Sequence, residues 1–229
     1  MQYTHGRELG LLGQKGGSKF RNLKPLARLV ALAPLVVMLA CVAGQKVDTT
    51  YTPEPESAAP DQGAVALSVV DQREYVLSGD KDPSYIGKFR AGFGNTFDIK
   101  TEGQVPLAEL IAKDLGADLE ALGFSLPQGV ATPCRLEVSI RDWNSDSYRN
   151  AEIWYDVDVR VTDQQGQVLH EEKIKKENIV IEGSAMTGPK KAFMKEYPGI
   201  YKSVIMQIAR DNDAVLNALR QQPPSDSKP

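Results

Sequence analysis

The sequence is poor in cysteine. Only Cys41 and Cys134 occur among its 229 residues. If Cys41 carries a modification, Cys134 has no partner, so an internal disulfide is excluded. The fold must then be stabilised by its hydrophobic core, and about 155 residues are enough to build one.

The sequence also lacks a hydrophobic run long enough to span a membrane. The apolar stretch at residues 29–40 would rise about 18 Å as a helix, whereas the hydrocarbon core of a bilayer is about 30 Å thick. The stretch is therefore too short to span a membrane, and it contains Pro34. Before it lie six basic residues and one acidic residue, Glu8, with no Arg-Arg pair. This pattern predicts that residues 1–40 are a signal peptide cleaved after export by the Sec route.

The end of the apolar stretch resembles the bacterial lipobox. That motif is usually Leu-(Ala/Ser)-(Gly/Ala)-Cys, and this chain has Met38-Leu39-Ala40-Cys41. Lipidation needs a thiol that accepts the diacylglyceryl group and a small residue at the cleavage point. The motif therefore predicts a lipid on Cys41, and several acyl chains together would anchor the protein stably to a membrane. The alternative is an ordinary thiol beside an ordinary cleavage site.

Val42 follows the predicted lipidation site. An Asp at this position retains lipoproteins at the inner membrane of enteric bacteria. The resemblance to sorted lipoproteins therefore implies that the protein is held at the outer membrane and faces the periplasm, rather than at the inner membrane.

Loss of the leader makes the protein more acidic. The whole chain has a formal net charge of −3, and removing the leader's net charge of +5 leaves −8. Proteins that bind nucleic acid generally present a basic face. We therefore expect no nucleic-acid partner.

Composition divides the mature chain into three parts. Residues 41–62 are rich in Pro, Thr, Ser and Glu without aliphatic periodicity, which predicts a flexible, lipid-anchored tether. Residues 221–229 have the same character and are predicted to be a disordered tail. Residues 63–220 lie between them and are predicted to form a single periplasmic domain.

The clearest predicted element is a helix over residues 106–122. Pro106 marks its start and Gly123 its end, and leucines recur between them at helical spacing. A second helix is predicted over residues 199–210, followed by a short last helix. The polar face of the first helix is expected to be solvated and consists of Glu109, Lys113, Asp114, Asp118 and Glu120.

Alternating apolar and polar residues predict the strands. One strand opens the fold at residues 64–71, and short strands are expected near 85–89 and 97–99. Three antiparallel strands follow at residues 135–141, 152–161 and 168–181, and the second of these has one apolar and one polar face. The order of elements predicts an α+β two-layer sandwich, in which a mainly antiparallel sheet has one face covered by two helices.

Short signatures stand at the ends of these elements. They are Val70-Asp71-Gln72-Arg73, Ala121-Leu122-Gly123-Phe124, Asp163-Gln164-Gln165-Gly166 and Glu182-Gly183. Together with the lipobox, the polar tether and the terminal helix, they resemble the YajG family of uncharacterised bacterial lipoproteins. The resemblance covers most of residues 64–220. It implies an envelope lipoprotein of α+β fold, with no activity and no site residues to carry over.

Few residues suit catalysis or metal binding. His170 could serve Cys134 as a base, but nothing in the sequence brings the two together. Residues 142–146 begin like a calcium loop, but Ser147 and Ile153 stand where Gly and Glu are required. We interpret these residues as a polar hairpin loop. A Gly-x-Ser-x-Gly motif is absent, and we expect no enzymatic activity, no metal and no cofactor.

Two features could contact a partner. Trp154 falls on the polar face of its strand among carboxylates, where it could anchor another protein, unless a loop or a long side chain covers it. Lys190 and Lys191 lie in a basic, aromatic stretch at residues 188–195. This stretch could touch phosphate headgroups, or it could be a solvated loop before the last helices.

The leading hypothesis is an envelope lipoprotein that works as a non-enzymatic binding or assembly subunit with a protein partner. The alternative is an auxiliary lipoprotein of an envelope lipid or solute transporter, and a hydrolase that uses His170 or Cys134 ranks last. A hydrophobic groove between helices and sheet would favour the transporter. A tightly packed interface with an exposed Trp154 would favour protein binding.

Overall fold

The computed structural model describes residues 45–53, 61–90, 95–183 and 188–221. The predicted signal peptide, Cys41 and residues 222–229 of the predicted tail lie outside these ranges. The chain divides into two units between Ala43 and Gly44, and every element below belongs to the second unit.

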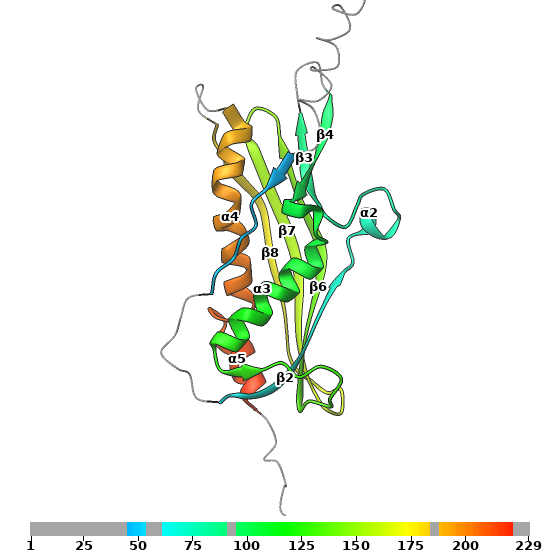
Figure 1. Cartoon of the computed structure of the whole chain (residues 1–229), viewed down its shortest axis with the longest axis vertical. Helices are drawn as coiled ribbons and strands as arrows, with labels where there is room; N and C mark the ends of the chain where they lie inside the picture. The colour runs from blue at the N-terminus through cyan, green and yellow to red at the C-terminus, as the bar shows by residue number, and fades with distance from the viewer. Residues whose placement is uncertain (1–44, 54–60, 91–94, 184–187, 222–229) are drawn as a thin grey trace, which may run out of the picture. The chain divides into compact units, whose positions relative to one another are not determined.

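The described residues form an α+β fold (Figure 1). The strands are β1 (Gln45–Val47), β2 (Gly63–Asp71), β3 (Tyr85–Arg90), β4 (Thr96–Thr101), β5 (Phe124–Ser125), β6 (Cys134–Ser147), β7 (Ala151–Asp163) and β8 (Val168–Ile181). The helices are α2 (Glu74–Leu77), the 3-10 helix η2 (Glu102–Gln104), α3 (Leu107–Ala121), α4 (Gly188–Ile208) and α5 (Asp213–Arg220). The strands join in one sheet in the order β1-β4-β3-β6-β2-β5, and β7 and β8 continue it from the other edge of β6.

The sheet is mixed, so the prediction of a mainly antiparallel sheet is wrong. β6, β7 and β8 are antiparallel as expected, but β2 runs parallel to β6 from Val65 opposite Cys134 to Asp71 opposite Ile140. Parallel strands need a crossover connection, and here the connection between β2 and β6 includes α3. β1 with β4, β2 with β5, and β3 with β6 are also parallel.

β6 is longer than predicted. Residues 142–146 continue this strand and do not form a hairpin loop. Arg141 is an extra residue in the pairing with β7, between Ile140 and Asp142. Such a bulge shifts the alternation of side chains by one position. As a result Trp143 points inward and is fully buried.

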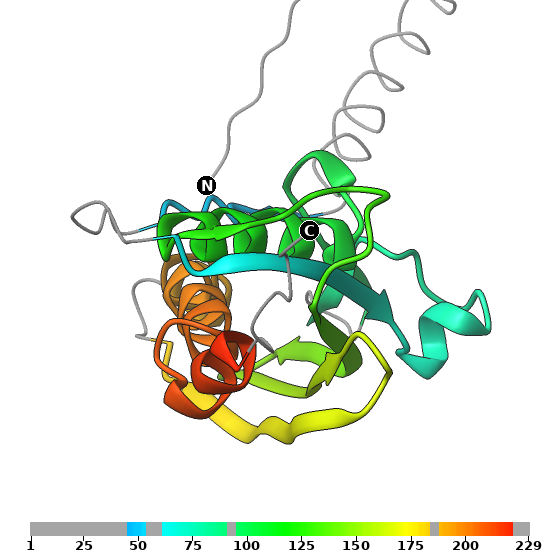
Figure 2. The same cartoon turned by 90° about the horizontal axis from the view of Figure 1, so that it is seen from below.

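The concave side of the sheet holds the core. The sheet curves around α4 and α5, and α3 lies along β2 (Figure 2). α4 begins at Gly188, earlier than the predicted start at 199, and Pro198 lies within it. Phe193, Tyr197 and Tyr201 follow at helical spacing and are buried, and this buried stripe extends the helix through the proline.

α3 matches its predicted bounds closely, and Glu109, Lys113 and Glu120 on its polar face are exposed as predicted. The prediction is wrong for the other two residues of this face. Asp114 and Asp118 are both buried. The Tyr201 hydroxyl donates to Asp114 Oδ2 at 2.8 Å. Arg210 donates to Asp118 Oδ1, with Nε at 3.0 Å. These carboxylates therefore connect α3 to α4 and to the residues that follow α4.

Part of the predicted tether belongs to the fold. β1 pairs with β4, with Gln45 opposite Ile99. Val47 is fully buried. The Tyr51 hydroxyl donates to Asp118 Oδ1 at 3.0 Å. Residues 45–53, which we call the N-terminal strap, thus complete one edge of the sheet.

Candidate functional site

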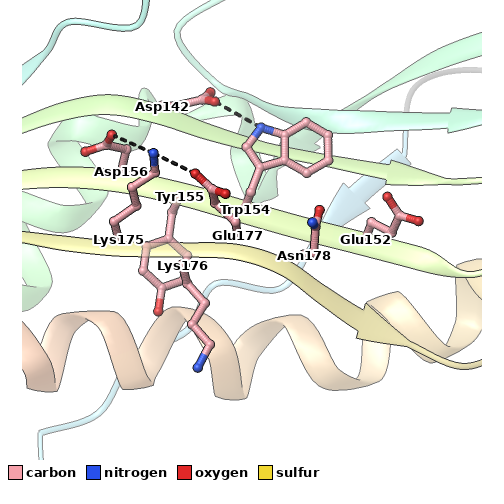
Figure 3. Close-up of a pocket in the computed structure, with 9 residues that line it drawn as sticks. All are labelled: Asp142, Glu152, Trp154, Tyr155, Asp156, Lys175, Lys176, Glu177 and Asn178. Atoms are coloured by element: carbon pink, nitrogen blue, oxygen red, sulfur yellow. Dashed lines mark hydrogen bonds and ion pairs between the residues drawn. The ribbon is translucent and has the colours of Figure 1, made fainter.

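Trp154 lies on the outward face of β7, where the alternation predicts it. Its neighbours Ile153 and Tyr155 are buried on the inward face, whereas Trp154 is only partly buried. Its indole Nε1 donates a hydrogen bond to Asp142 Oδ2 on β6 at 2.9 Å (Figure 3). One hydrogen bond and a flanking strand therefore hold the ring in place without covering it.

A bulge in β8 hollows the surface beside Trp154. Ile153 pairs with Ile179 and Tyr155 with Lys176, so two residues of β8 stand opposite the single residue Trp154. One of these two, Asn178, has a φ of 55°, a left-handed conformation that asparagine tolerates. The resulting Trp154 hollow has a volume of about 390 Å³ and is lined by Asp142, Glu152, Trp154, Tyr155, Asp156, Lys175, Lys176, Glu177 and Asn178.

The rim of the Trp154 hollow is charged, and Asp156, Lys175 and Glu177 on it form ion pairs. Lys175 Nζ lies 2.6 Å from Glu177 Oε1 and 3.9 Å from Asp156 Oδ2. Lys173 Nζ lies 3.4 Å from Asp156 Oδ1. The partly exposed indole is therefore the apolar feature inside a ring of charges of both signs. Such an arrangement suits the contact of an aromatic anchor with a protein surface.

The two lysines of the predicted contact stretch lie elsewhere. The expectation of a loop there is wrong, because Lys190 and Lys191 belong to the first turn of α4. Lys190 Nζ lies 5.4 Å from the centre of the Phe89 ring, a cation–π contact. Lys191 is exposed. Neither lysine lines the Trp154 hollow.

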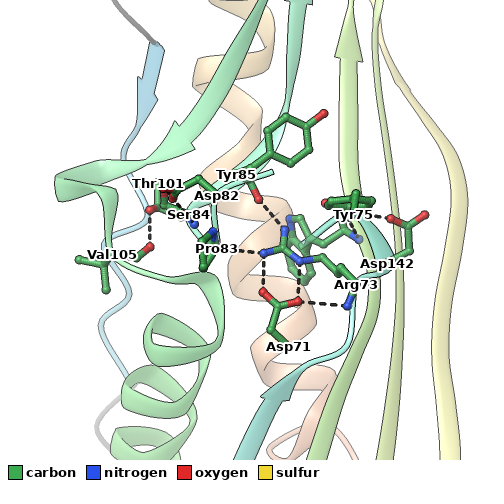
Figure 4. Close-up of polar contacts among 11 residues, drawn as sticks. Asp71, Arg73, Tyr75, Asp82, Pro83, Ser84, Tyr85, Thr101, Val105 and Asp142 are labelled. Carbon is green, nitrogen blue, oxygen red and sulfur yellow. Dashed lines mark hydrogen bonds and ion pairs between the residues drawn. The ribbon is translucent and has the colours of Figure 1, made fainter. Parts of the chain in front are cut away.

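The Asp-Gln-Arg signature ends in Arg73, whose guanidinium is fully buried (Figure 4). Arg73 Nε donates to Asp71 Oδ1 at 2.8 Å, and Nη2 donates to Asp71 Oδ2 at 2.6 Å. Arg73 also donates to the carbonyl oxygens of Pro83 and Tyr85. Burial by itself lowers the pKa of Arg73, but the hydrogen bond and charge of Asp71 help to raise it above its ordinary value. The signature thus fixes the path of the chain between β2 and β3.

Tyr75, whose ring centre lies 5.5 Å from the guanidinium carbon of Arg73, extends this network to β6. β2 pairs with β6 as far as Ile140, and β3 pairs with it only from Asp146 onward. Tyr75 lies beside the intervening residues: its hydroxyl donates to the Trp143 carbonyl oxygen at 2.8 Å and lies 3.1 Å from Asp142 Oδ1. Asp142 therefore joins the Arg73 network to the Trp154 hollow. Sequence reasoning missed this link because it treated Asp142 as a loop residue.

Cys134 and His170 occupy separate places. Cys134 is buried on β6 opposite Asp163, and burial together with the charge of Asp163 raises the pKa of its thiol. A nucleophilic cysteine needs the opposite shift. His170 lies on β8, with Nε2 3.7 Å from Glu172 Oε2. The described residues contain no group of three or more His, Cys, Asp or Glu side chains that could hold a metal ion.

Comparisons with known proteins give a fold likeness only. No protein-family model matches the sequence, and no curated protein matches it. The fold is similar to that of protein XCC0632 from Xanthomonas campestris, described as DUF330, with a TM-score of 0.50 and 12% identity over 78% of this chain and 100% of that one. A solved uncharacterized protein gives a TM-score of 0.44 with 14% identity over 73% and 98% of the two chains.

Lipoprotein GNA1162 from Neisseria meningitidis is more distant, with a TM-score of 0.26 and 11% identity over 65% of this chain and 99% of that one. No helix among the described residues is long and apolar enough to cross a membrane. The resemblance to the YajG family stays a prediction from the sequence.

Proposed function

We propose that this chain is a lipid-anchored envelope protein that works in the periplasm as a non-enzymatic binding or assembly subunit, without a cofactor or a nucleic-acid partner. The observation that carries the proposal is the Trp154 hollow. A tryptophan is left partly exposed on a rigid strand, is oriented by Asp142, and is surrounded by charged side chains. Hot spots of protein interfaces are enriched in tryptophan, which buries a large area at low entropic cost.

The packing of the helices supports protein binding over the transporter alternative. A transporter subunit that shelters an apolar ligand needs a groove between helices and sheet. Here Leu115 on α3, Val157 on β7 and Val204 on α4 are fully buried in one continuous core. The aromatic surface that is available faces outward, on the other side of β7.

The proposed location in the cell envelope and the proposed family both rest on the sequence. The lipobox at Cys41 and the residue Val42 support attachment to the outer membrane, and the short signatures at the ends of the helices and strands support membership of the YajG family. Replacing Cys41 with Ser tests the anchor, because a serine hydroxyl cannot form the thioether to the lipid. Metabolic labelling with a fatty-acid analogue should mark the wild type only. Equal labelling of both would contradict the anchor.

The binding role is tested in intact cells. A photo-crosslinking amino acid at Glu152, an exposed position on the rim of the hollow, should capture a discrete envelope protein. The capture should weaken strongly in a Trp154→Ala background. The same amino acid at Gln165, in the turn between β7 and β8, is the matched control. Equal products at both positions, or products unaffected by Trp154→Ala, would contradict a partner at the hollow.

A further inference from the structure

The distance between the predicted lipid and the fold is short. Val42, Ala43 and Gly44 alone separate Cys41 from Gln45, the first residue of β1. Four residue steps span at most about 14 Å even when fully extended. This step rests on the proposed lipidation of Cys41. Given that lipid, the end of the domain where β1 begins must lie at the membrane surface.

The pairings of the sheet identify this end of the domain. Gln45 lies opposite Ile99, and β4 begins three residues earlier, at Thr96, opposite the last residue of β3. β3 runs parallel to β6, so β6 also ends here, and β7 begins here beside the end of β8. The first turn of α4 contacts Phe89 of β3 through Lys190. All these termini lie at the upper end of Figure 1.

This end is basic, although the mature chain is acidic. The turn between β6 and β7 presents Arg149 and Tyr148, which is 57% exposed. The guanidinium of Arg90 lies 5.9 Å from the centre of the Tyr148 ring. Lys190 and Lys191 stand on the first turn of α4. We call Arg90, Tyr148, Arg149, Lys190 and Lys191 the basic end.

Acidic side chains at the same end are fewer or already paired. Asp146 lies 2.5 Å from Arg90 Nη2 and 3.3 Å from Lys88 Nζ. Glu196 lies 3.1 Å from Lys195 Nζ. Glu152 and Glu182 are exposed. Exposed arginine and lysine beside a tyrosine match the chemistry of a membrane–water interface, where basic residues attract anionic headgroups and tyrosine sits at headgroup level.

We infer that the basic end rests on anionic phospholipid headgroups of the membrane that holds the lipid of Cys41. The lipid supplies the anchor, and the basic end fixes the orientation of the domain on it. The turn between β7 and β8 then points away from the membrane, because β7 spans roughly 40 Å between the two turns. The outward face that carries Trp154 stands beside the membrane and stays open to a periplasmic partner.

The test measures orientation on the full-length, lipidated protein. Asn150→Cys at the basic end and Gln165→Cys at the opposite end each receive a fluorescent label, since both positions are exposed and the remaining thiol, Cys134, is buried. The proteins are reconstituted in vesicles of phosphatidylethanolamine and phosphatidylglycerol that contain a headgroup-nitroxide lipid. The label at position 150 should be quenched, and the label at position 165 should not. Equal quenching at both positions, or stronger quenching at 165, would overturn the inference.

A charge variant isolates the role of the basic end. Arg149→Glu combined with Lys191→Glu changes two exposed side chains and leaves the link to Cys41 intact. The short link still keeps position 150 nearer the membrane than position 165, but the quenching at position 150 should become clearly weaker than in the wild type. Vesicles of phosphatidylcholine alone should weaken it as well. Quenching at position 150 that is unchanged in both cases would contradict headgroup binding. Mass spectrometry of the purified protein checks the lipid first: an unlipidated Cys41 refutes the proposed anchor, whereas a lipidated protein without orientation refutes only this inference.

Discussion

Asp142 holds Trp154 in place through one carboxylate oxygen, while its other oxygen lies 3.1 Å from the hydroxyl of Tyr75. Through Tyr75 the same carboxylate is connected to the buried Arg73 network. The orientation of the exposed indole therefore depends on residues that fix the chain between β2 and β3. Two tryptophans close together in space have opposite roles: Trp143 is buried in the core, and Trp154 faces outward.

Replacing each tryptophan with alanine should separate these roles. Trp143→Ala removes a fully buried ring that donates a hydrogen bond to the Tyr197 hydroxyl, and it should lower the free energy of unfolding by about 3–5 kcal/mol. Trp154→Ala should change stability much less but weaken partner capture by about 2 kcal/mol or more. Thermal melting and crosslinking yields measure the two effects. Unfolding of the Trp154 variant would make that residue structural.

Loss of the buried guanidinium should be costly. Arg73→Met leaves the Asp71 carboxylate and two carbonyl oxygens without their donor, and it should destabilise the fold by about 3–5 kcal/mol. The matched control is Lys81→Met, which removes the half-exposed ion pair between Lys81 and Asp98 and should cost about 0–1 kcal/mol. Urea unfolding of both variants provides the measurement. Equal losses of stability in the two variants would show that Arg73 is not the residue that fixes the chain between β2 and β3.

A pair of leucine variants tests the packing of helix α3. Leu115 is fully buried, whereas Leu77 on α2 is 69% exposed. Leu115→Ala should cost about 2–5 kcal/mol because it leaves a cavity in the core. Leu77→Ala should lie within about 0.5 kcal/mol of the wild type. Similar melting temperatures for the Leu115 variant and the wild type would contradict the packing of α3.

The N-terminal strap should contribute to stability. A fragment of residues 45–221 retains the pairing of β1 with β4, the buried Val47 and the hydrogen bond of Tyr51 to Asp118. A fragment of residues 61–221 lacks all three and should melt at a lower temperature. Equal melting of the two fragments would show that the strap is not required, as expected of a simple tether.

Two carboxylates, the buried Asp114 and the partly buried Asp146, should respond to pH in opposite directions. Burial raises the pKa of Asp114, so its charge is disfavoured in the fold and stability falls as the pH rises from about 4 through the raised value. Burial alone would raise the pKa of Asp146, but hydrogen bonds from Arg90 and Lys88 lower it. Its contribution is therefore present above about pH 4 and is lost as the pH falls through the lowered value.

Replacing Asp114 or Asp146 with asparagine should remove the contribution of that residue to the pH dependence of stability. Asp114→Asn should flatten the decline above about pH 4, and Asp146→Asn should flatten the decline below it, each by about 1.4 kcal/mol per unit of pKa difference. Unfolding free energies measured across the acidic range decide this. A slope that is unchanged in either variant would contradict the assignment for that residue.

The sequence predicts elements here better than it predicts their pairing. Apolar periodicity locates α3 and β7 closely, and alternation alone places Trp154 on the outward face. It does not reveal the bulge at Arg141, so the inward direction of Trp143 is missed. Periodicity also cannot show that β2 runs parallel to β6, because pairing depends on contacts between distant segments.

Composition is a weaker guide for short segments. Residues 45–53 look like a tether because they lack apolar periodicity, yet three paired residues and one buried valine suffice to dock them. The sequence shows Asp71-Gln72-Arg73 only as a short signature and does not indicate that Arg73 forms a buried hydrogen-bond network. Burial of an arginine depends on acceptors such as the carbonyl oxygen of Pro83, which no side-chain pattern can show.

The parallel pairing of β2 with β6 has a consequence for folding kinetics. Val65 cannot reach Cys134 until every residue between them has been synthesised, and the same delay applies to β1, which waits for β4. Folds dominated by such distant contacts form slowly, on the scale of milliseconds to seconds. The proposed export fits this order of folding, because a channel that admits only unfolded polypeptide requires that the sheet does not assemble around its first strands before the later strands are available.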